Sequence, residues 1–187
     1  MPPGETVVEL GCGQGVLLQY LRAHGFPTCI GIEPDPERAA YCRSRGLDVR
    51  PGTAQAVPLP AESCGAVVME CVYSLCEPGP TVRELARILR SGGTLVLTDL
   101  YAHGVGMTLA DSPLCRRVPR REELEDELQT RFTLERFLDQ TDALRQYAMQ
   151  LLLSGAGEAD CTREAFRRLK PAKPGYGVWI WKKNSPR

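Results

Sequence analysis

The sequence predicts an α/β fold built on a doubly wound, mostly parallel seven-stranded sheet. Short apolar segments end at Gly, Pro or acidic residues, and segments with helical spacing lie between them. The early apolar segments lack polar alternation, which is typical of strands covered on both faces. Because strands and helices alternate along the chain, we expect βαβ units and therefore a parallel sheet.

The expected strands and helices follow one another over the whole chain. The strands are Thr6–Leu10, Cys29–Glu33, Asp48–Arg50, Ala66–Cys71, Thr94–Leu100, Leu134–Asp139 and Tyr176–Lys182. The helices are Val16–His24, Pro36–Arg45, Thr81–Leu89, Arg121–Leu128, Gln140–Ser154 and a short one at Arg163–Leu169. The stretches Ala102–Pro119 and Gly155–Pro174 fit neither pattern.

Length and composition indicate an ordinary globular protein. The 187 residues suit a single domain spanning residues 1–187. Lys plus Arg equals Asp plus Glu, 23 against 23, so nucleic acid is a poor expected partner. No apolar run approaches the roughly 20 residues that cross a membrane, and no secretory signal is visible. The eight cysteines fit reduced thiols in a cytoplasmic protein better than a disulfide framework.

A glycine-rich turn follows the first strand. In Gly11-Cys12-Gly13-Gln14-Gly15 the glycines let the backbone turn sharply and approach a ligand. The amides at the start of the next helix can hold an anionic group. A nicotinamide-dinucleotide fingerprint would require glycine at position 16. That position is Val16, which disfavours a dehydrogenase.

Glu33 ends the second strand, where a carboxylate can accept hydrogen bonds from ribose hydroxyls. The alternative is that Glu33 serves the start of the next helix. Asp35 and Glu37 already meet that need, so the ribose role is favoured.

These segments together resemble the class I S-adenosylmethionine-dependent methyltransferases, particularly their type 11 small-molecule branch, over nearly the whole chain. Four segments carry the resemblance, namely Glu9–Gly15, Glu33, Gly52–Leu59 and Arg87–Leu95. It implies a Rossmann-like fold that ends in an antiparallel hairpin, supplied by Leu134–Asp139 and Tyr176–Lys182.

The resemblance also implies the binding residues for S-adenosylmethionine, whose product is S-adenosylhomocysteine. They are Glu9, Gly11, Cys12, Gly13, Gly15, Glu33, Pro34, Thr53, Ala54, Gln55, Glu70 and Cys71. Ala54 and Gln55 would present backbone groups to the adenine, with Pro34 packed nearby. Glu70 and Cys71 would lie beside the methionine portion and the methyl group.

The chain departs from the family pattern in three places. Thr53 stands where the family often has an adenine-contacting Asp, and Gly65 replaces a frequent Asp. The N-terminal helices that usually cover the cofactor are expected to be absent. This indicates an open site, a shortened chain, or a lid supplied by a homodimer partner or another protein.

The expected function is methyl transfer to a small-molecule acceptor. The alternative is a cofactor-binding subunit that needs a partner for substrate binding or activity. Such transfer needs no dedicated base when the nucleophile is an anion or a free amine. The candidate bases near the strand ends are His103, Tyr101 and Tyr73.

Two further clusters leave alternatives open. Cys71, Cys76 and Cys115 are expected at the active-site edge, where they would suit a thiophilic metalloid substrate, although no metal site is expected. The basic run Arg116–Arg121 would meet an anionic partner, or would pair with the acids that follow it. Pairing with Glu122, Glu123 and Glu125 is favoured.

Overall fold

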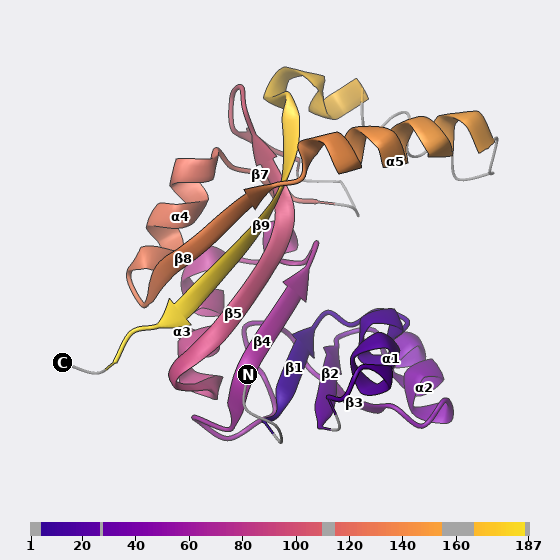
Figure 1. Cartoon of the computed structure of the whole chain (residues 1–187), viewed down its shortest axis with the longest axis vertical. Helices are drawn as coiled ribbons and strands as arrows, with labels where there is room; N and C mark the ends of the chain where they lie inside the picture. The colour runs from indigo at the N-terminus through magenta and orange to yellow at the C-terminus, as the bar shows by residue number, and fades with distance from the viewer. Residues whose placement is uncertain (1–4, 27, 110–114, 155–166, 186–187) are drawn as a thin grey trace.

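Seven strands form one twisted sheet in the computed structural model, which describes residues 5–26, 28–109, 115–154 and 167–185. The strand order is β3-β2-β1-β4-β5-β9-β8 (Figure 1). The bounds are β1 Val7–Leu10, β2 Cys29–Glu33, β3 Asp48–Pro51, β4 Cys64–Glu70, β5 Leu89–Ala102, β8 Phe132–Asp139 and β9 Pro174–Lys183. All seven expected strands are therefore present, with small differences in their ends.

The strands from β3 to β5 pair in parallel, and β9 pairs antiparallel with both β5 and β8. The expected doubly wound, Rossmann-like sheet with a C-terminal antiparallel pair is confirmed. The parallel register places the ends of β1, β2 and β4, at Leu10, Glu33 and Glu70, along one side of the sheet. We call this side the carboxyl edge, where open α/β sheets bind their ligands.

Helices cover both faces of the sheet. The helices α1 (Val16–Ala23) and α2 (Pro36–Ser44) pack through Leu18, Ala39 and Cys42 onto β1, β2 and β3. The helices α3 (Pro78–Ile88) and α4 (Arg121–Gln129) contribute Leu85, Leu124 and others to a larger core with Trp179 and Trp181. The last helix, α5, spans Thr141–Ser154. No helix in the described ranges has the length and apolar character needed to span a membrane.

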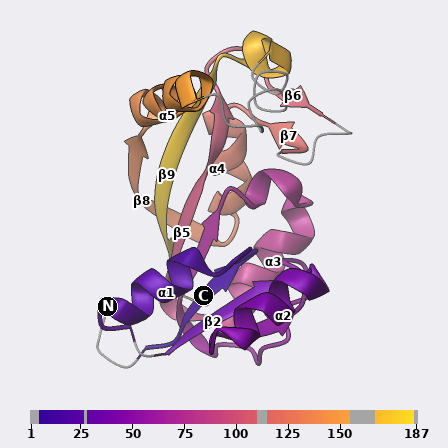
Figure 2. The ribbon, with the colours of Figure 1, turned by 90° about the vertical axis from the view of Figure 1, so that its right-hand side faces the viewer.

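The structure corrects the sequence interpretation at three places. Within Ala102–Pro119, a small antiparallel pair forms from β6 (Met107–Thr108) and β7 (Arg117–Val118). The helix expected from Thr81 starts at Pro78, because proline is well tolerated in a first helical turn. The strand β5 starts five residues before Thr94, at Leu89. Figure 2 shows β6, β7 and α5 at the end of the molecule toward which β5 runs.

The helix predicted at Arg163–Leu169 lies partly outside the described residues. Residues 167–169 are helical and continue into a 3-10 turn at Lys170–Ala172.

Asp35 caps α2, and replacing it by alanine is expected to cost about 1 kcal/mol of folding stability. Its side chain accepts hydrogen bonds from the backbone N–H groups of Glu37 and Arg38, at 2.8 and 3.1 Å. Chemical denaturation of Asp35→Ala measures this loss. Asp48→Ala, which removes an exposed carboxylate that caps no helix, is the control. An unchanged midpoint for Asp35→Ala would contradict the capping role.

Candidate functional site

The glycine-rich loop turns from β1 into α1 with three left-handed glycines. Gly11, Gly13 and Gly15 have φ values of 70°, 53° and 75°. A Cβ on Gly11 would lie 2.5 Å from the side chain of Val72, so this glycine is needed for packing. A Cβ on Gly13 would meet nothing within 4 Å. The surface at Gly13 is therefore open, and a ligand can approach its backbone closely.

Glu33 joins this loop to the end of β2. Its side chain is 3% exposed, with Oε2 accepting from the Gly13 N–H at 2.8 Å and Oε1 accepting from the Asp35 N–H at 3.1 Å. Each carboxylate oxygen has a second lone pair that can still accept a hydroxyl proton. Since Asp35 caps α2 itself, Glu33 is not the helix cap, as the sequence interpretation argued.

Three carboxylates crowd the carboxyl edge. Glu9, in the middle of β1, is only 4% exposed, and its Oε2 has no hydrogen-bond partner among the described residues. Burial first, and then the charges of Glu70 and Glu33, raise the pKa of Glu9 to about 8. The backbone N–H of Leu18 opposes this rise. The edge thus gathers three carboxyl groups, of which Glu9 keeps its proton at neutral pH, and an unpaired buried carboxyl oxygen lies among them.

The other predicted binding residues lie around this edge. Pro34 is exposed directly after Glu33, and the Gly52 N–H donates to the Glu33 carbonyl at 3.3 Å. Residues 53–56 form a tight turn closed by paired backbone hydrogen bonds between Thr53 and Ala56, which puts Ala54 and Gln55 at its tip. The structure therefore brings the predicted residues of the loop, Glu33 and the turn together.

The end of β4 carries a feature that the sequence interpretation missed. Cys71 is exposed and has a left-handed φ of 54°, which is uncommon for a residue other than glycine. Its Sγ lies 3.5 Å from the Tyr176 hydroxyl, which donates to Thr98 Oγ1 at 2.9 Å. Tyr176 comes from β9, and no local sequence signal connects it with Cys71. The antiparallel β5–β9 register brings the two together.

A family model described as a methyltransferase domain matches residues 8–97, which include the loop, Glu33 and the end of β4. Residues 8–97 are thereby assigned to the class I S-adenosylmethionine-dependent methyltransferase family. The resemblance expected from the sequence is confirmed at this level.

Curated relatives of the family match about half of this chain in sequence. A fatty-acid O-methyltransferase of Mycolicibacterium smegmatis is 33% identical over 102 residues, covering 51% of this chain and 37% of the relative. A ubiquinone biosynthesis O-methyltransferase of Caulobacter vibrioides is 33% identical over 106 residues, covering 52% and 41%. The matches thus span less than half of the length of these relatives.

Solved structures share the fold over nearly the whole chain. A geranyl diphosphate methyltransferase in complex with S-adenosylmethionine superposes with a TM-score of 0.85 at 17% identity, covering 98% of this chain and 79% of that one. The [4+2]-cyclase SpnF superposes with a TM-score of 0.79 at 20% identity, covering 100% and 77%. At these identities the likeness establishes the fold alone.

The three candidate bases differ in their surroundings. Tyr73, in a 3-10 turn at Tyr73–Leu75, is 0% exposed and donates to Glu127 at 2.9 Å. Burial raises its pKa. Tyr73 is thus packed in the core with its hydroxyl bonded to Glu127, and its role as a base stays a prediction.

Tyr101 and His103 form a hydrogen-bond network apart from the Cys71–Tyr176–Thr98 contacts. The Tyr101 hydroxyl donates to Asp139 at 3.0 Å and lies 3.1 Å from His103 Nε2. Tyr101 packs against Trp179 in the core that α3 and α4 cover. Because side chains alternate along β5, Thr98 lies on the opposite face of the sheet. Their role as bases stays a prediction.

The thiols show no metal-binding arrangement. Among the described residues, no three His, Cys, Asp or Glu side chains gather as a set of metal ligands. Cys76 donates to the Val72 carbonyl at 3.2 Å, and Cys115 is buried. Burial raises the pKa of the Cys12 and Cys64 thiols to about 12. The Cys12 and Cys64 thiols are thus protonated and unreactive at neutral pH.

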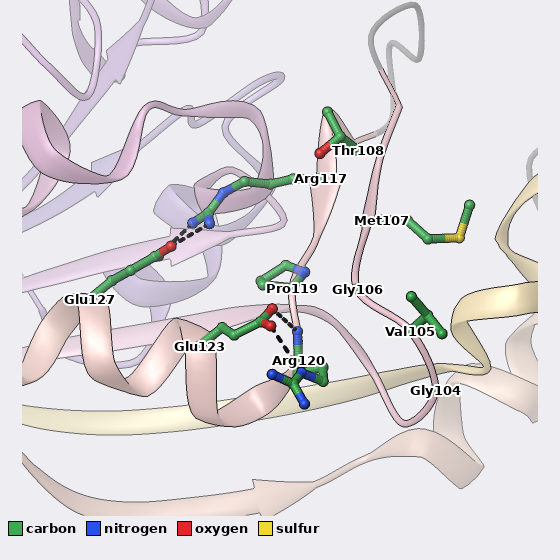
Figure 3. A pocket seen from close by; sticks show the side chains of 10 residues that line it. All are labelled: Gly104, Val105, Gly106, Met107, Thr108, Arg117, Pro119, Arg120, Glu123 and Glu127. Carbon is green, nitrogen blue, oxygen red and sulfur yellow. Dashed lines mark hydrogen bonds and ion pairs between the residues drawn. The ribbon is translucent and has the colours of Figure 1, made fainter.

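The basic run Arg116–Arg121 is largely paired with acids. Arg120 bonds to Glu123 at 2.9 Å and Arg121 to Glu125 at 2.6 Å, as favoured from the sequence. The pairing predicted for Glu122 is replaced by a two-pronged ion pair between Arg117 and Glu127. Figure 3 shows that two of these pairs lie in the hollow beside β6 and β7. Three of the four arginines of the run, Arg117, Arg120 and Arg121, are therefore neutralised by glutamates, whereas Arg116 is exposed and has no carboxylate partner among the described residues.

Proposed function

We propose that this chain binds S-adenosylmethionine at the carboxyl edge and transfers its methyl group to a small-molecule acceptor. One observation carries the proposal: the buried carboxyl group of Glu9, whose Oε2 has no partner among the described residues, lies near the carboxylates of Glu33 and Glu70, which repel its ionised form, and next to the open surface at Gly13. A cationic ligand relieves this repulsion, whereas the pyrophosphate of a dinucleotide increases it.

The residues present fit this cofactor. When bound, it supplies a methyl group on a positively charged sulfur, together with an ammonium group. The unpartnered Oε2 of Glu9 is a hydrogen-bond acceptor available to a cation. Glu33 keeps lone pairs for ribose hydroxyls while it fixes the loop through Gly13. The tip of the turn at Ala54 and Gln55 offers backbone groups to the adenine.

The acceptor is proposed only as a small molecule. The relatives act on a fatty acid or in ubiquinone biosynthesis, to judge from their names, and one structural neighbour is a [4+2]-cyclase. The Cys71–Tyr176–Thr98 contacts lie where the sequence interpretation puts the methyl group, so we place the acceptor there. The second hypothesis is a cofactor-binding subunit that needs a partner for substrate binding or activity.

We further propose that the chain acts as one methyltransferase domain in the cytoplasm. The seven cysteines within the described ranges are all free thiols, which a reducing compartment maintains.

Calorimetry tests the cofactor assignment. We expect S-adenosylmethionine and S-adenosylhomocysteine to bind, and NADH not to bind. Tighter binding of NADH would refute the proposal. Release of S-adenosylhomocysteine in the presence of acceptor panels then tests transfer, with the chain alone and with added partner proteins. Release of S-adenosylhomocysteine only after a partner protein is added would favour the hypothesis of a partner-dependent subunit.

A further inference from the structure

A second hollow lies at the end of the sheet opposite the carboxyl edge. It is about 690 Å³ in volume and is bounded by the C-terminal parts of α3, α4 and β9. These parts meet where β9 ends, because β9 runs antiparallel to β5 (Figure 1). The backbone N–H of Asn184 donates to the Arg131 carbonyl at 3.0 Å, which joins two walls of the hollow. We call it the basic hollow.

The charged residues that line the basic hollow are all positive. They are Arg83, Arg87, Arg131 and Lys183, and no acidic residue in the described ranges lines it. Arg87 is neutralised by Glu84 at 2.7 Å, and Lys183 pairs with Glu62 at 3.1 Å. Arg83 and Arg131 are exposed and have no carboxylate partner among the described residues.

This arrangement contrasts with the run Arg116–Arg121, where Arg117, Arg120 and Arg121 each have a glutamate. Arg83 and Arg131 line the same hollow without a carboxylate partner among the described residues, so they form a local excess of positive charge on a chain with no net charge. The attraction of basic residues to helix C-termini does not explain Arg83, which lies in the middle of α3.

The other polar residues of the hollow suit an oxyanion. Gln129, Asn184 and Ser185 are neutral groups that can donate hydrogen bonds, whereas the Thr130 hydroxyl already donates to the Glu127 carbonyl at 3.2 Å. The Asn184 Oδ1 accepts from Thr133 at 2.7 Å, which leaves its amide N–H groups as donors. Guanidinium groups bind phosphate through two parallel hydrogen bonds, and a hollow of this volume is of the size that holds a small ligand.

We propose that the basic hollow is a binding site for a small molecule that carries a phosphate or diphosphate group, with Arg83 and Arg131 as its main contacts. The site is separate from the proposed cofactor site and does not depend on it. Its ligand would act on the methyltransferase as an effector or a second bound metabolite.

Calorimetry with inorganic pyrophosphate tests this proposal on the full chain. We expect measurable binding that weakens as salt is added, and that weakens at least about fivefold in Arg83→Gln and in Arg131→Gln. The Glu33→Gln variant should bind pyrophosphate as the unmodified chain does, which separates this site from the carboxyl edge. Arg136→Gln, which changes an exposed arginine on β8, is the matched control.

Three results would overturn the proposal. They are undetectable binding of pyrophosphate, equal weakening in Arg136→Gln, and binding of a short single-stranded oligonucleotide without binding of pyrophosphate. The last result would assign the basic hollow to nucleic acid.

Discussion

Replacing Glu33 by alanine is expected to weaken binding of S-adenosylmethionine at least tenfold. The carboxylate accepts from the Gly13 N–H, and we propose that it also accepts from the ribose hydroxyls. A hydrogen bond to a charged group contributes about 1.5–3 kcal/mol, and a factor of ten corresponds to about 1.4 kcal/mol. Calorimetry of Glu33→Ala measures the loss. Glu37→Gln, an exposed neighbour on α2, is the control.

Glu33→Gln separates the two roles of this residue. Competition by adenosine and by its dideoxy analogue reports the ribose contact, because the analogue lacks both hydroxyls. We expect adenosine to compete better in the unmodified chain and this advantage to shrink in Glu33→Gln. Undiminished cofactor affinity in Glu33→Ala would count against the whole assignment of the site.

The arrangement of the glycine-rich loop and Glu33 could be predicted because its signals are local. A strand ending in glycines, an acid at the end of the next strand, and Pro36 beside the capping Asp35 each act within a few residues. The parallel register then places such strand ends at one edge without further information. The same local signals located all seven strands of the sheet.

The remaining features depend on pairings between distant segments. Tyr176 reaches Cys71 only through the β5–β9 register, and Arg83 lines the same hollow as Arg131 only because α3 packs beside α4. The β6–β7 pair consists of two residues on each strand, too short for a pattern of alternation. The crowding of Glu9 with Glu70 likewise follows from the pairing of β1 with β4.

Replacing Glu9 by glutamine is expected to stabilise the ligand-free chain near pH 8. In the folded chain the pKa of Glu9 rises from 4.5 to about 8, first through burial and then through Glu70. Between these values the unfolded chain has lost the proton and the folded chain keeps it, so the free energy of unfolding falls as pH rises. Above about pH 8 both states are ionised and the fall stops. The full effect is on the order of 5 kcal/mol.

Urea denaturation of the unmodified chain and of Glu9→Gln, at several pH values from about 5 to 9, measures this difference. The unmodified chain should lose stability relative to the variant as pH rises. Glu135→Gln, an exposed substitution on β8, should follow the unmodified chain. Parallel curves for the unmodified chain and Glu9→Gln would show that Glu9 is already ionised in the folded, ligand-free protein.

The same carboxyl group predicts how cofactor affinity depends on pH. If a cation beside Glu9 favours its ionised form, binding releases the proton that the ligand-free chain holds below about pH 8. Affinity for S-adenosylmethionine should then rise with pH up to about 8, by at most about tenfold for each pH unit, and level off above it. Glu9→Gln should bind more weakly at pH 8 and lose this slope. A slope that persists in Glu9→Gln would assign the released proton to another group. A carboxylate that destabilises the empty fold would thus contribute to ligand binding through the charge that it acquires when the site fills.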